Sequence, residues 1–467
     1  MSCPRIDNCP VPTDKFTTQR VARTLSRGRE VFANPCMTDN RGMRLSTILI
    51  LYLAQGIPIG LLEFAIPAWM AASGATAGEI GYVIGMAAIP WSLKFVNGAL
   101  MDRYAYLPMG RRRAWLIGSQ VVMITSLLLC ALLEPGPRDE VLLGAIAFIV
   151  SLAVVFQDVA ADALAVDICD KGERGYAGGI MAGGQALGIA ITASIAGLII
   201  YQFGVGAGYV SAAIVIIFIT AYLVWVRERT GERRLPWSDG SASPDSVAIQ
   251  ADSWVELLKG AFRYLFRRDS LIWSGSIFLR GLGYGTMAVA VPLIAANYAG
   301  WNEAQIGAAN GTAQLVSAIA AITLGGWLCS RLGAKQFQIL TYALFAVAIG
   351  AFALLESFWA EAWMIWVIAV GWTVLYNLVG TGNGAINMAF CDPKTGATQF
   401  SIYMAFVNQG TSFAGFTFAL LAGFGGLQAP LFFLAIGILV ATALTLLITV
   451  PSHRDAPHAE QPEIAPA

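Results

Sequence analysis

The sequence predicts an all-α membrane protein of twelve transmembrane helices, arranged as two halves of six helices each. Composition gives the first indication: 57% of the 467 residues are hydrophobic and only 12% are charged. A soluble domain carries about 25% charged residues. The apolar residues also form uninterrupted runs, and a run of about 18 or more can cross the hydrocarbon core as a helix. An internal repeat, described below, gives the third indication.

Each predicted helix is an apolar run bounded by polar or charged residues. The first six are Leu45–Ala71, Glu79–Met101, Trp115–Leu133, Val141–Val166, Tyr176–Phe203 and Gly208–Val226. The second six are Leu271–Ala296, Glu303–Leu328, Phe337–Leu355, Ala362–Met388, Thr398–Gly423 and Pro430–Val450.

The basic residues predict the orientation. If both termini are cytoplasmic, the inner loops hold nearly all the loop arginines and lysines, and the outer loops hold only Arg138. This distribution follows the positive-inside rule. We therefore expect a multi-pass protein whose two termini both lie in the cytoplasm.

The same reading divides the chain into five parts. They are a disordered cytoplasmic tail (1–42), a six-helix half (43–226), a cytoplasmic linker (227–270), a second six-helix half (271–450) and a cytoplasmic tail (451–467). Within the linker, Trp254–Phe266 has the pattern of an amphipathic helix lying along the membrane surface. The arginine-rich part of the first tail offers an alternative, a contact with anionic lipid.

The two halves resemble each other in sequence. Gly56, Gly60, Ala65 and Pro67 in the first helix match Gly281, Gly285, Ala290 and Pro292 in the seventh without a gap. Two parallel six-helix repeats are the layout of the major facilitator superfamily, and we predict that fold.

A second repeated motif lies at the inner ends of helices two and eight. Gly98-x-x-x-Asp102-Arg103 matches Gly326-x-x-x-Ser330-Arg331, and a basic run follows the first copy. Glycine allows close helix approach, and an acid paired with an arginine could open and close as the halves move. We predict a gating role for Gly98, Asp102, Arg103, Arg111, Arg112, Gly326 and Arg331. The alternative is an anchor that only fixes topology.

Few charged residues lie inside the predicted spans: Glu63, Lys94, Asp158, Asp162 and Arg280. Such charges are costly in a bilayer and usually serve a function. Asp158 and Asp162 are four residues apart and share one helix face, and carboxylates that repel each other favour the uptake of a proton. We predict that Asp158, Asp162 and Glu63 couple transport to protons. We expect one layer of buried charge, with Lys94 and Arg280 opposite Asp158 and Asp162. The alternative is a static ion pair between helices two and four. Asp167, near a helix end, is expected to reach water.

The remaining polar residues of the spans are candidates for binding a solute. We predict a substrate site formed by Lys94, Arg280, Gln55, Tyr52, Gln157, Trp91, Tyr284, Asn377 and Asn383. Each could equally well pack between helices. The sequence has no phosphate-binding loop of the Gly-x-x-x-x-Gly-Lys-Ser/Thr type, no metal-ligand spacing and no nucleophile–base pair. We therefore expect no cofactor, no metal and no enzymatic activity.

Several segments resemble the AmpG-type muropeptide permeases and the related acetyl-CoA transporters. They are Pro90–Phe95, Met101–Tyr104, Gly110–Trp115, Gln157–Asp167, Glu173–Gly175 and Ala397–Phe400. The resemblance extends over roughly residues 43 to 450 and is strongest in helices one to five.

The resemblance implies a proton-driven importer in a bacterial inner membrane that carries N-acetylglucosaminyl-anhydro-N-acetylmuramic acid, with or without its peptide, for peptidoglycan recycling. Expected partners are the solute, protons and membrane lipid, without nucleic acid, and the protein is expected to be a monomer. Alternatives are a permease for a siderophore or an acetyl-CoA-like solute, or a non-transporting sensor or assembly factor.

Overall fold

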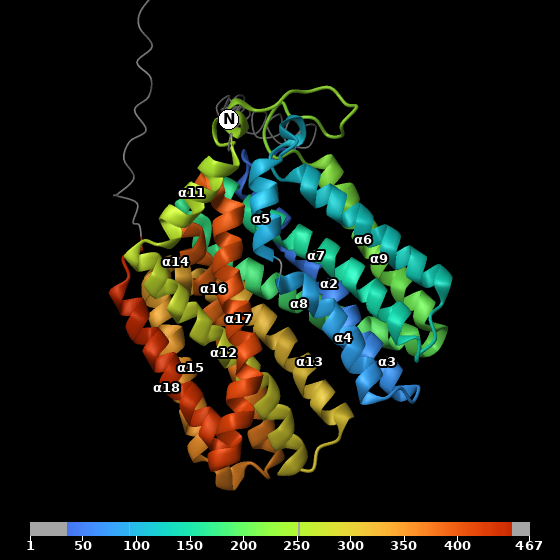
Figure 1. Cartoon of the computed structure of the whole chain (residues 1–467), viewed down its shortest axis with the longest axis vertical. Helices are drawn as coiled ribbons and strands as arrows, with labels where there is room; N and C mark the ends of the chain where they lie inside the picture. Colours follow the sequence, from blue (N-terminus) through green and yellow to red (C-terminus); the bar gives the residue numbers. More distant parts are fainter. Residues whose placement is uncertain (1–34, 93, 251–252, 451–467) are drawn as a thin grey trace, which may run out of the picture.

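A computed structural model describes residues 35–92, 94–250 and 253–450. The described residues are helical apart from loops and one isolated bridge between Cys36 and Arg227. Most of the predicted tail 1–42 and all of the predicted tail 451–467 lie outside the described residues. Figure 1 shows the helices as two groups that lie side by side.

The first half contains six spans. They are α2 with η1 and α3 (Arg41–Gly60, Leu61–Ala65, Ile66–Ala72), α4 with α5 (Ala77–Ser92, Lys94–Arg103), α6 (Arg113–Leu133), α7 (Glu140–Ile168), α8 (Arg174–Phe203) and α9 (Val205–Trp225). The second half contains α12 (Arg268–Asn297), α13 with η4 and α14 (Glu303–Ala320, Ala321–Gly325, Gly326–Leu332), α15 (Ala334–Leu354), α16 (Ala362–Phe390), α17 (Gly396–Gly425) and α18 (Gln428–Leu447).

Eleven of these spans, over the described residues, are long and apolar enough to cross a membrane. The remaining one, α17, has 30 residues but is less apolar, because it carries Gln399, Asn408 and Gln409 among its polar side chains. It packs in the bundle along α12 and α5. The predicted all-α fold is confirmed.

The first and eighth spans each contain one π-helical turn, η1 and η4. In the first span the turn ends two residues before Pro67. The proline ring has no N–H and clashes with the carbonyl four residues earlier in a regular α-helix, and that residue, Glu63, lies in the turn. The two turns lie in different spans of the repeat, so the halves are related in layout without being identical.

Each half has its own apolar core, and a third core joins the two halves. This shared core includes Met101 and Leu164 from the first half and Ile277 and Phe400 from the second. It lies near the end of the molecule that carries the linker, which we call the linker end. The opposite end, which carries the short loops between α3 and α4 and between α12 and α13, is the far end.

The linker is attached mainly to the first half. The backbone N–H of Arg233 donates to the carbonyl of Pro108 at 2.7 Å, and Gln250 donates to the carbonyls of Asp102 and Arg103, each at 2.9 Å. The predicted amphipathic helix is present as α11 (Trp254–Leu265). It contacts α5 of the first half and α12 and α17 of the second.

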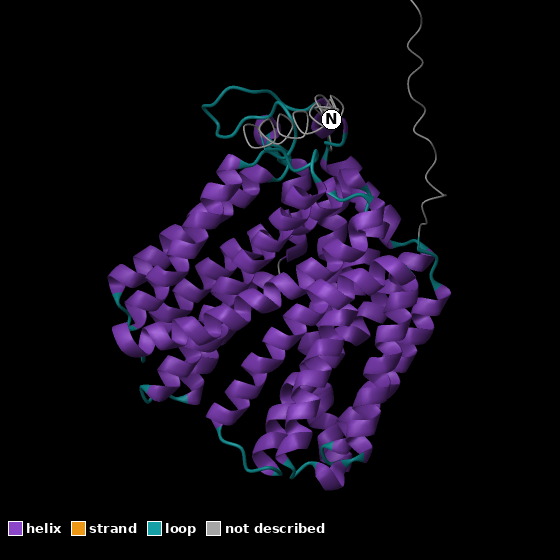
Figure 2. Cartoon of the chain, turned by 180° about the vertical axis from the view of Figure 1, so that it is seen from behind, coloured by secondary structure: helices purple, strands orange, loops and turns teal. Residues whose placement is uncertain are grey.

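The two halves approach each other closely at the linker end and separate toward the far end, as Figures 1 and 2 show. At the linker end a Cβ added to Gly98 would lie only 2.6 Å from the carbonyl oxygen of Ala397 across the interface. Toward the far end, a Cβ added to Gly85 or Gly415 would meet nothing within 4 Å. The structure is therefore a conformer that is closed at the linker end.

Candidate functional site

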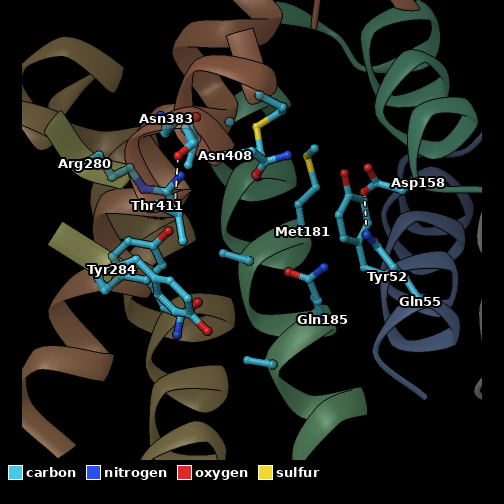
Figure 3. Close-up of a pocket in the computed structure, with 18 of the residues that line it drawn as sticks. Tyr52, Gln55, Asp158, Met181, Gln185, Arg280, Tyr284, Asn383, Asn408 and Thr411 are labelled. Carbon is cyan, nitrogen blue, oxygen red and sulfur yellow. Dashed lines mark hydrogen bonds between the residues drawn. The ribbon is translucent and has the colours of Figure 1, made fainter. Parts of the chain in front are cut away.

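A cavity of about 290 Å³ lies between the halves and is lined by residues of both. A second cavity of about 480 Å³ shares Tyr284, Gln314 and Trp372 with it and continues along α8 and α12 past Phe64 and Pro292. The pair forms a path from the centre of the molecule toward the far end. Figure 3 shows Tyr52, Gln55 and Asp158 on one side of the central cavity and Arg280 and Tyr284 on the other.

The first half contributes an ion cluster to the cavity wall. The ammonium of Lys94 lies 2.9 Å from a carboxylate oxygen of Asp162 and contacts Asp158 as well. All three side chains are at least 95% buried. The sequence brings them together because Asp158 and Asp162 are one helical turn apart on α7, and α5 packs against α7.

Two neutral side chains from α2 complete this cluster. The Tyr52 hydroxyl donates to Asp162, and the Gln55 amide donates to Asp158. Two ionised carboxylates facing one ammonium would leave a net negative charge in a buried site, which is costly. One proton bound to the carboxylate pair makes the cluster neutral.

The second half contributes a cation of a different kind. Arg280 is 8% exposed and lines the cavity, and its guanidinium carbon lies 4.4 Å from the centre of the Tyr376 ring. No carboxylate lies within 4 Å of it among the residues that the structure describes. A buried cation without a counter-ion is a natural partner for an anionic group on a solute.

An aromatic wall surrounds Arg280. The ring centres of Tyr284 and Tyr376 are 5.0 Å apart, and Trp372 lies 6.0 Å from Tyr284 and 6.2 Å from Tyr376. Rings of this kind give a flat apolar surface with polar edges, which suits the faces of a sugar ring.

Amide side chains reach the same cavity. Asn377 donates to the Ser317 hydroxyl at 2.9 Å, while the Asn383 amide nitrogen is buried with no hydrogen-bond partner among the described residues. Gln185, Gln314 and Asn408 also line the cavity. These groups can bond hydroxyl or acetamido groups of a solute.

Most of the predicted substrate residues line the central cavity: Tyr52, Gln55, Trp91, Lys94, Arg280, Tyr284, Asn377 and Asn383. Gln157 does not. Its amide donates to the carbonyl of Leu51 at 3.0 Å, so it joins α7 to α2. Consecutive helical residues point about 100° apart, and with Asp158 directed at the cavity Gln157 is directed elsewhere.

Glu63 lies outside the central cluster. It is part of the π-helical turn η1, nearer the far end, and has no ion pair among the described residues. Its neighbour Phe64 lines the outer cavity together with Tyr284 of the other half. Glu63 thus lies apart from Asp158 and Asp162, nearer the far end.

One contact that closes the linker end is charged, and we call it the charged seam (Asp102, Arg111, Arg112, Asp167 and Thr398). Asp102 accepts from the Thr398 backbone at 2.8 Å and from its hydroxyl at 2.7 Å, at the start of α17. Arg112 and Arg111 pair with Asp102 at 2.7 and 3.4 Å. A carboxylate at a helix N-terminus is favourable.

Arg103 is not part of the charged seam. Its guanidinium lies over the Tyr104 ring at 5.2 Å, because neighbouring helical residues point in different directions. Asp167, which the sequence analysis expected to reach water, is instead buried and pairs with Arg112 at 2.9 Å and with Arg111 at 3.3 Å. The expectation for Asp167 was wrong, since the basic loop folds over it.

A further contact between the halves at the linker end is neutral, and we call it the glycine seam (Gly175, Gly179, Gly326 and Ser330). A Cβ on Gly179 would lie 2.5 Å from the Ala321 carbonyl, and one on Gly175 would lie 2.7 Å from the Ser330 hydroxyl. Gly326 thus lies at a contact between the halves. Arg331 does not, because it is exposed and lies over the Trp327 ring at 5.6 Å.

The sequence analysis missed Tyr376 among the cavity residues. Its spacing to Trp372 and Gly380 is four residues in each direction, so all three share one face of α16. This spacing can be seen in the sequence, but it does not show which face of α16 turns toward the cavity.

The chain matches the model of the Major Facilitator Superfamily over residues 48–391 and 274–466. The anhydromuropeptide permease of Escherichia coli (strain K12) is 25% identical over 389 residues, which cover 80% of this chain and 73% of that protein. The putative transporter AmpG 4 of Rickettsia conorii is 26% identical over 381 residues, covering 77% of this chain and 85% of that protein.

Solved transporters share the fold at low sequence identity. The human organic anion transporter MFSD10 superposes with a TM-score of 0.65 at 13% identity, covering 86% of this chain and 98% of that one. The transporter FucP in its outward conformation gives a TM-score of 0.63 at 11% identity, with the same coverage. The predicted resemblance to AmpG-type permeases is confirmed, and the chain belongs to the Major Facilitator Superfamily of membrane transporters.

Proposed function

We propose that this protein is a proton-coupled symporter that carries muropeptides into the cytoplasm across a bacterial inner membrane. Its relatives include an anhydromuropeptide permease. In this proposal the linker end is cytoplasmic, both termini are cytoplasmic and the protein works as a monomer.

The ion cluster of Lys94, Asp158 and Asp162 is the observation that carries the proton coupling. With one ammonium between two buried carboxylates, the cluster changes from a net negative charge to neutrality when it binds one proton. A neutral cluster crosses from one conformer to the other at lower cost than a charged one, because keeping a net charge in a site shielded from water is costly. Glu63 is a second proton-accepting candidate nearer the far end.

The opposite wall supports the choice of solute. Arg280 offers a buried positive charge, Tyr284, Trp372 and Tyr376 offer ring faces, and the amides offer donors and acceptors. An anhydro-muropeptide has sugar rings, acetamido groups and a carboxylate or peptide chain. These groups match the wall in kind.

The observed conformer then corresponds to the start of import. With the linker end in the cytoplasm, the cavity is closed toward the cytoplasm and continues toward the outside. The charged and glycine seams have to separate for release, so their residues act as the inner gate. Alternating access of this type is general for repeat-built transporters.

The test is uptake of labelled anhydro-muropeptide by right-side-out vesicles with and without an acidic exterior. We expect the proton gradient to drive accumulation in the unmodified protein. In Asp158→Asn the remaining Lys94 and Asp162 are already neutral as a pair, so we expect exchange of solute to persist and gradient-driven accumulation to stop. Asp139→Asn, an exposed loop carboxylate, is the matched control.

Arg280→Gln tests the solute part separately. Loss of a buried charged partner costs about 2–5 kcal/mol, so we expect at least about thirtyfold weaker apparent affinity, with only partial rescue by Arg280→Lys. If accumulation ignores the gradient, the coupling role is wrong. If the vesicles take up another solute but no muropeptide, the transporter assignment stands and the cargo assignment fails.

A further inference from the structure

Another cavity, polar and about 570 Å³ in volume, lies at the linker end, away from the central site and its extension toward the far end. Its wall comes from both halves: the α7–α8 connection on one side, and the start of α12 with the end of α16 on the other. Nothing in the proposed transport cycle uses it.

The cavity is rich in positive charge. Lys171, Arg174, Arg267 and Arg268 line it, against the two carboxylates of Asp269 and Asp392. Both carboxylates already accept backbone hydrogen bonds, from Thr449 at 3.1 Å and from Lys394 at 2.8 Å. None of the four cations has a carboxylate within 4 Å among residues 35–92, 94–250 and 253–450.

The backbone adds to this field. The long helix α12 begins at Arg268, and its N-cap residue Arg267 makes no side-chain capping bond, whereas α8 continues directly from the 3-10 turn Lys171–Glu173. Free N–H groups at the start of a helix attract anions, and phosphate in particular. The cavity therefore combines four cationic side chains, of which Arg267 lies 3.8 Å from the centre of the Tyr264 ring, with the N-terminus of α12.

The surroundings indicate a lipid. The cavity lies where membrane spans end, and Tyr264, Phe390 and Tyr403 form an aromatic part of its wall. The neighbouring helix α11 exposes Val255 and Phe262, with 75% and 49% of their surface accessible, as expected for a helix on a membrane surface. Basic pockets between transmembrane helices at the cytoplasmic side bind anionic headgroups.

We propose that this cavity binds the phosphate headgroup of an anionic membrane lipid, and that the bound headgroup holds the two halves together at the linker end. Lys171 and Arg174 belong to the first half, and Arg267 and Arg268 precede or begin the first span of the second. A ligand that binds only when these side chains are together favours the closed conformer, in proportion to its preference for that conformer.

The binding test uses the full chain in lipid nanodiscs, with retained lipid identified by native mass spectrometry. We expect the protein to retain phosphatidylglycerol over phosphatidylcholine, and Arg174→Gln/Arg267→Gln to bind it about tenfold or more weakly. Lys259→Gln removes one charge from the same end outside the cavity and should bind as the unmodified protein does. An equal loss in this control would overturn the proposal, because it would show general surface attraction.

A second test of occupancy needs no variant. Cys391 lines the cavity and is 9% exposed, so we expect its alkylation by a maleimide, read by peptide mass spectrometry, to be about tenfold slower in phosphatidylglycerol than in phosphatidylcholine. Equal rates would overturn the proposal. A third arm adds inorganic phosphate in phosphatidylcholine: protection by phosphate without selective retention of phosphatidylglycerol would show that the ligand is a free anion and refute the lipid assignment. None of these readouts depends on transport.

Discussion

The charged seam and the glycine seam occupy matching places in the two halves, yet they are held by different forces. In the charged seam Asp102 binds the start of α17 together with two arginines. At the matching position Ser330 has a buried hydroxyl without a partner among the described residues, and the contact depends on close backbone packing against Gly175 and Gly179. One copy of the repeat therefore carries the specific ionic bonds, while the other contributes only close packing.

The largest effect is expected from removing the carboxylate of the charged seam. Asp102→Asn leaves Arg111 and Arg112 sharing the single carboxylate of Asp167 in a buried place and weakens the helix-terminus contact. We expect the closed conformer to lose about 3 kcal/mol. Alkylation of Cys391 should accelerate about a hundredfold, with Asp239→Asn in the exposed linker as the control. An unchanged rate would mean that the seam does not hold the linker end closed.

A smaller effect is expected from overfilling the glycine seam. In Gly179→Leu the new side chain meets the Ala321 carbonyl and Gly326, and overpacking of this kind costs about 1–3 kcal/mol. We expect faster alkylation of Cys391 by about tenfold. Gly197→Leu, on the same helix but with open space around it, should leave the rate unchanged. Equal effects of the two leucines would assign the result to α8 itself and not to the seam.

Ser330→Asp gives the glycine seam the aspartate that the charged seam has at the matching position, and so tests whether that carboxylate accounts for the difference. The new carboxylate would lie beside the start of α8, where a negative charge is worth about 1 kcal/mol. We expect alkylation of Cys391 to slow about fivefold, while Ser330→Ala leaves it unchanged. Faster alkylation in the aspartate variant would show that Gly175 has no room for the larger group.

The smallest effect concerns the linker that supports the charged seam. Glu228 accepts from the backbone of Arg111 and Arg112, and burial next to Glu228 raises the pKa of Glu232 to about 7. The folded linker therefore keeps a proton that the unfolded chain releases near pH 4.5. Its stability is greatest at low pH and falls as pH rises toward 7.

Limited proteolysis of the linker by a protease active over a wide pH range checks this prediction. We expect residues 227–250 to be cut faster at pH 8 than at pH 6, and Glu232→Gln to remove most of the difference. A pH effect that survives in this variant would point to another group.

The sequence was sufficient for the spans and for the pairing of Lys94 with Asp158 and Asp162. Hydrophobic run length defines the first, and helical spacing together with the cost of buried charge predicts the second. The sequence also placed Arg280 in that layer, whereas Arg280 lies on the opposite wall with no carboxylate within 4 Å among the described residues. It was not sufficient to predict the rotation of each helix about its axis, which directs Asp158 toward the cavity and Gln157 toward α2. Nor could it show that the loop at Arg111 folds back over Asp167, because that depends on contacts between segments distant in the chain.

The attachment of the linker to one half has a consequence for how the chain is connected. Through Arg233, Gln250 and the bridge from Cys36 to Arg227, residues 227–250 of the linker are attached to the first half. The covalent connection between the halves then has no mechanical role in the rocking motion. We expect two separately translated pieces, one ending at Gln250 and the other beginning at Ser253, to assemble into a working protein when they are made in the same cell.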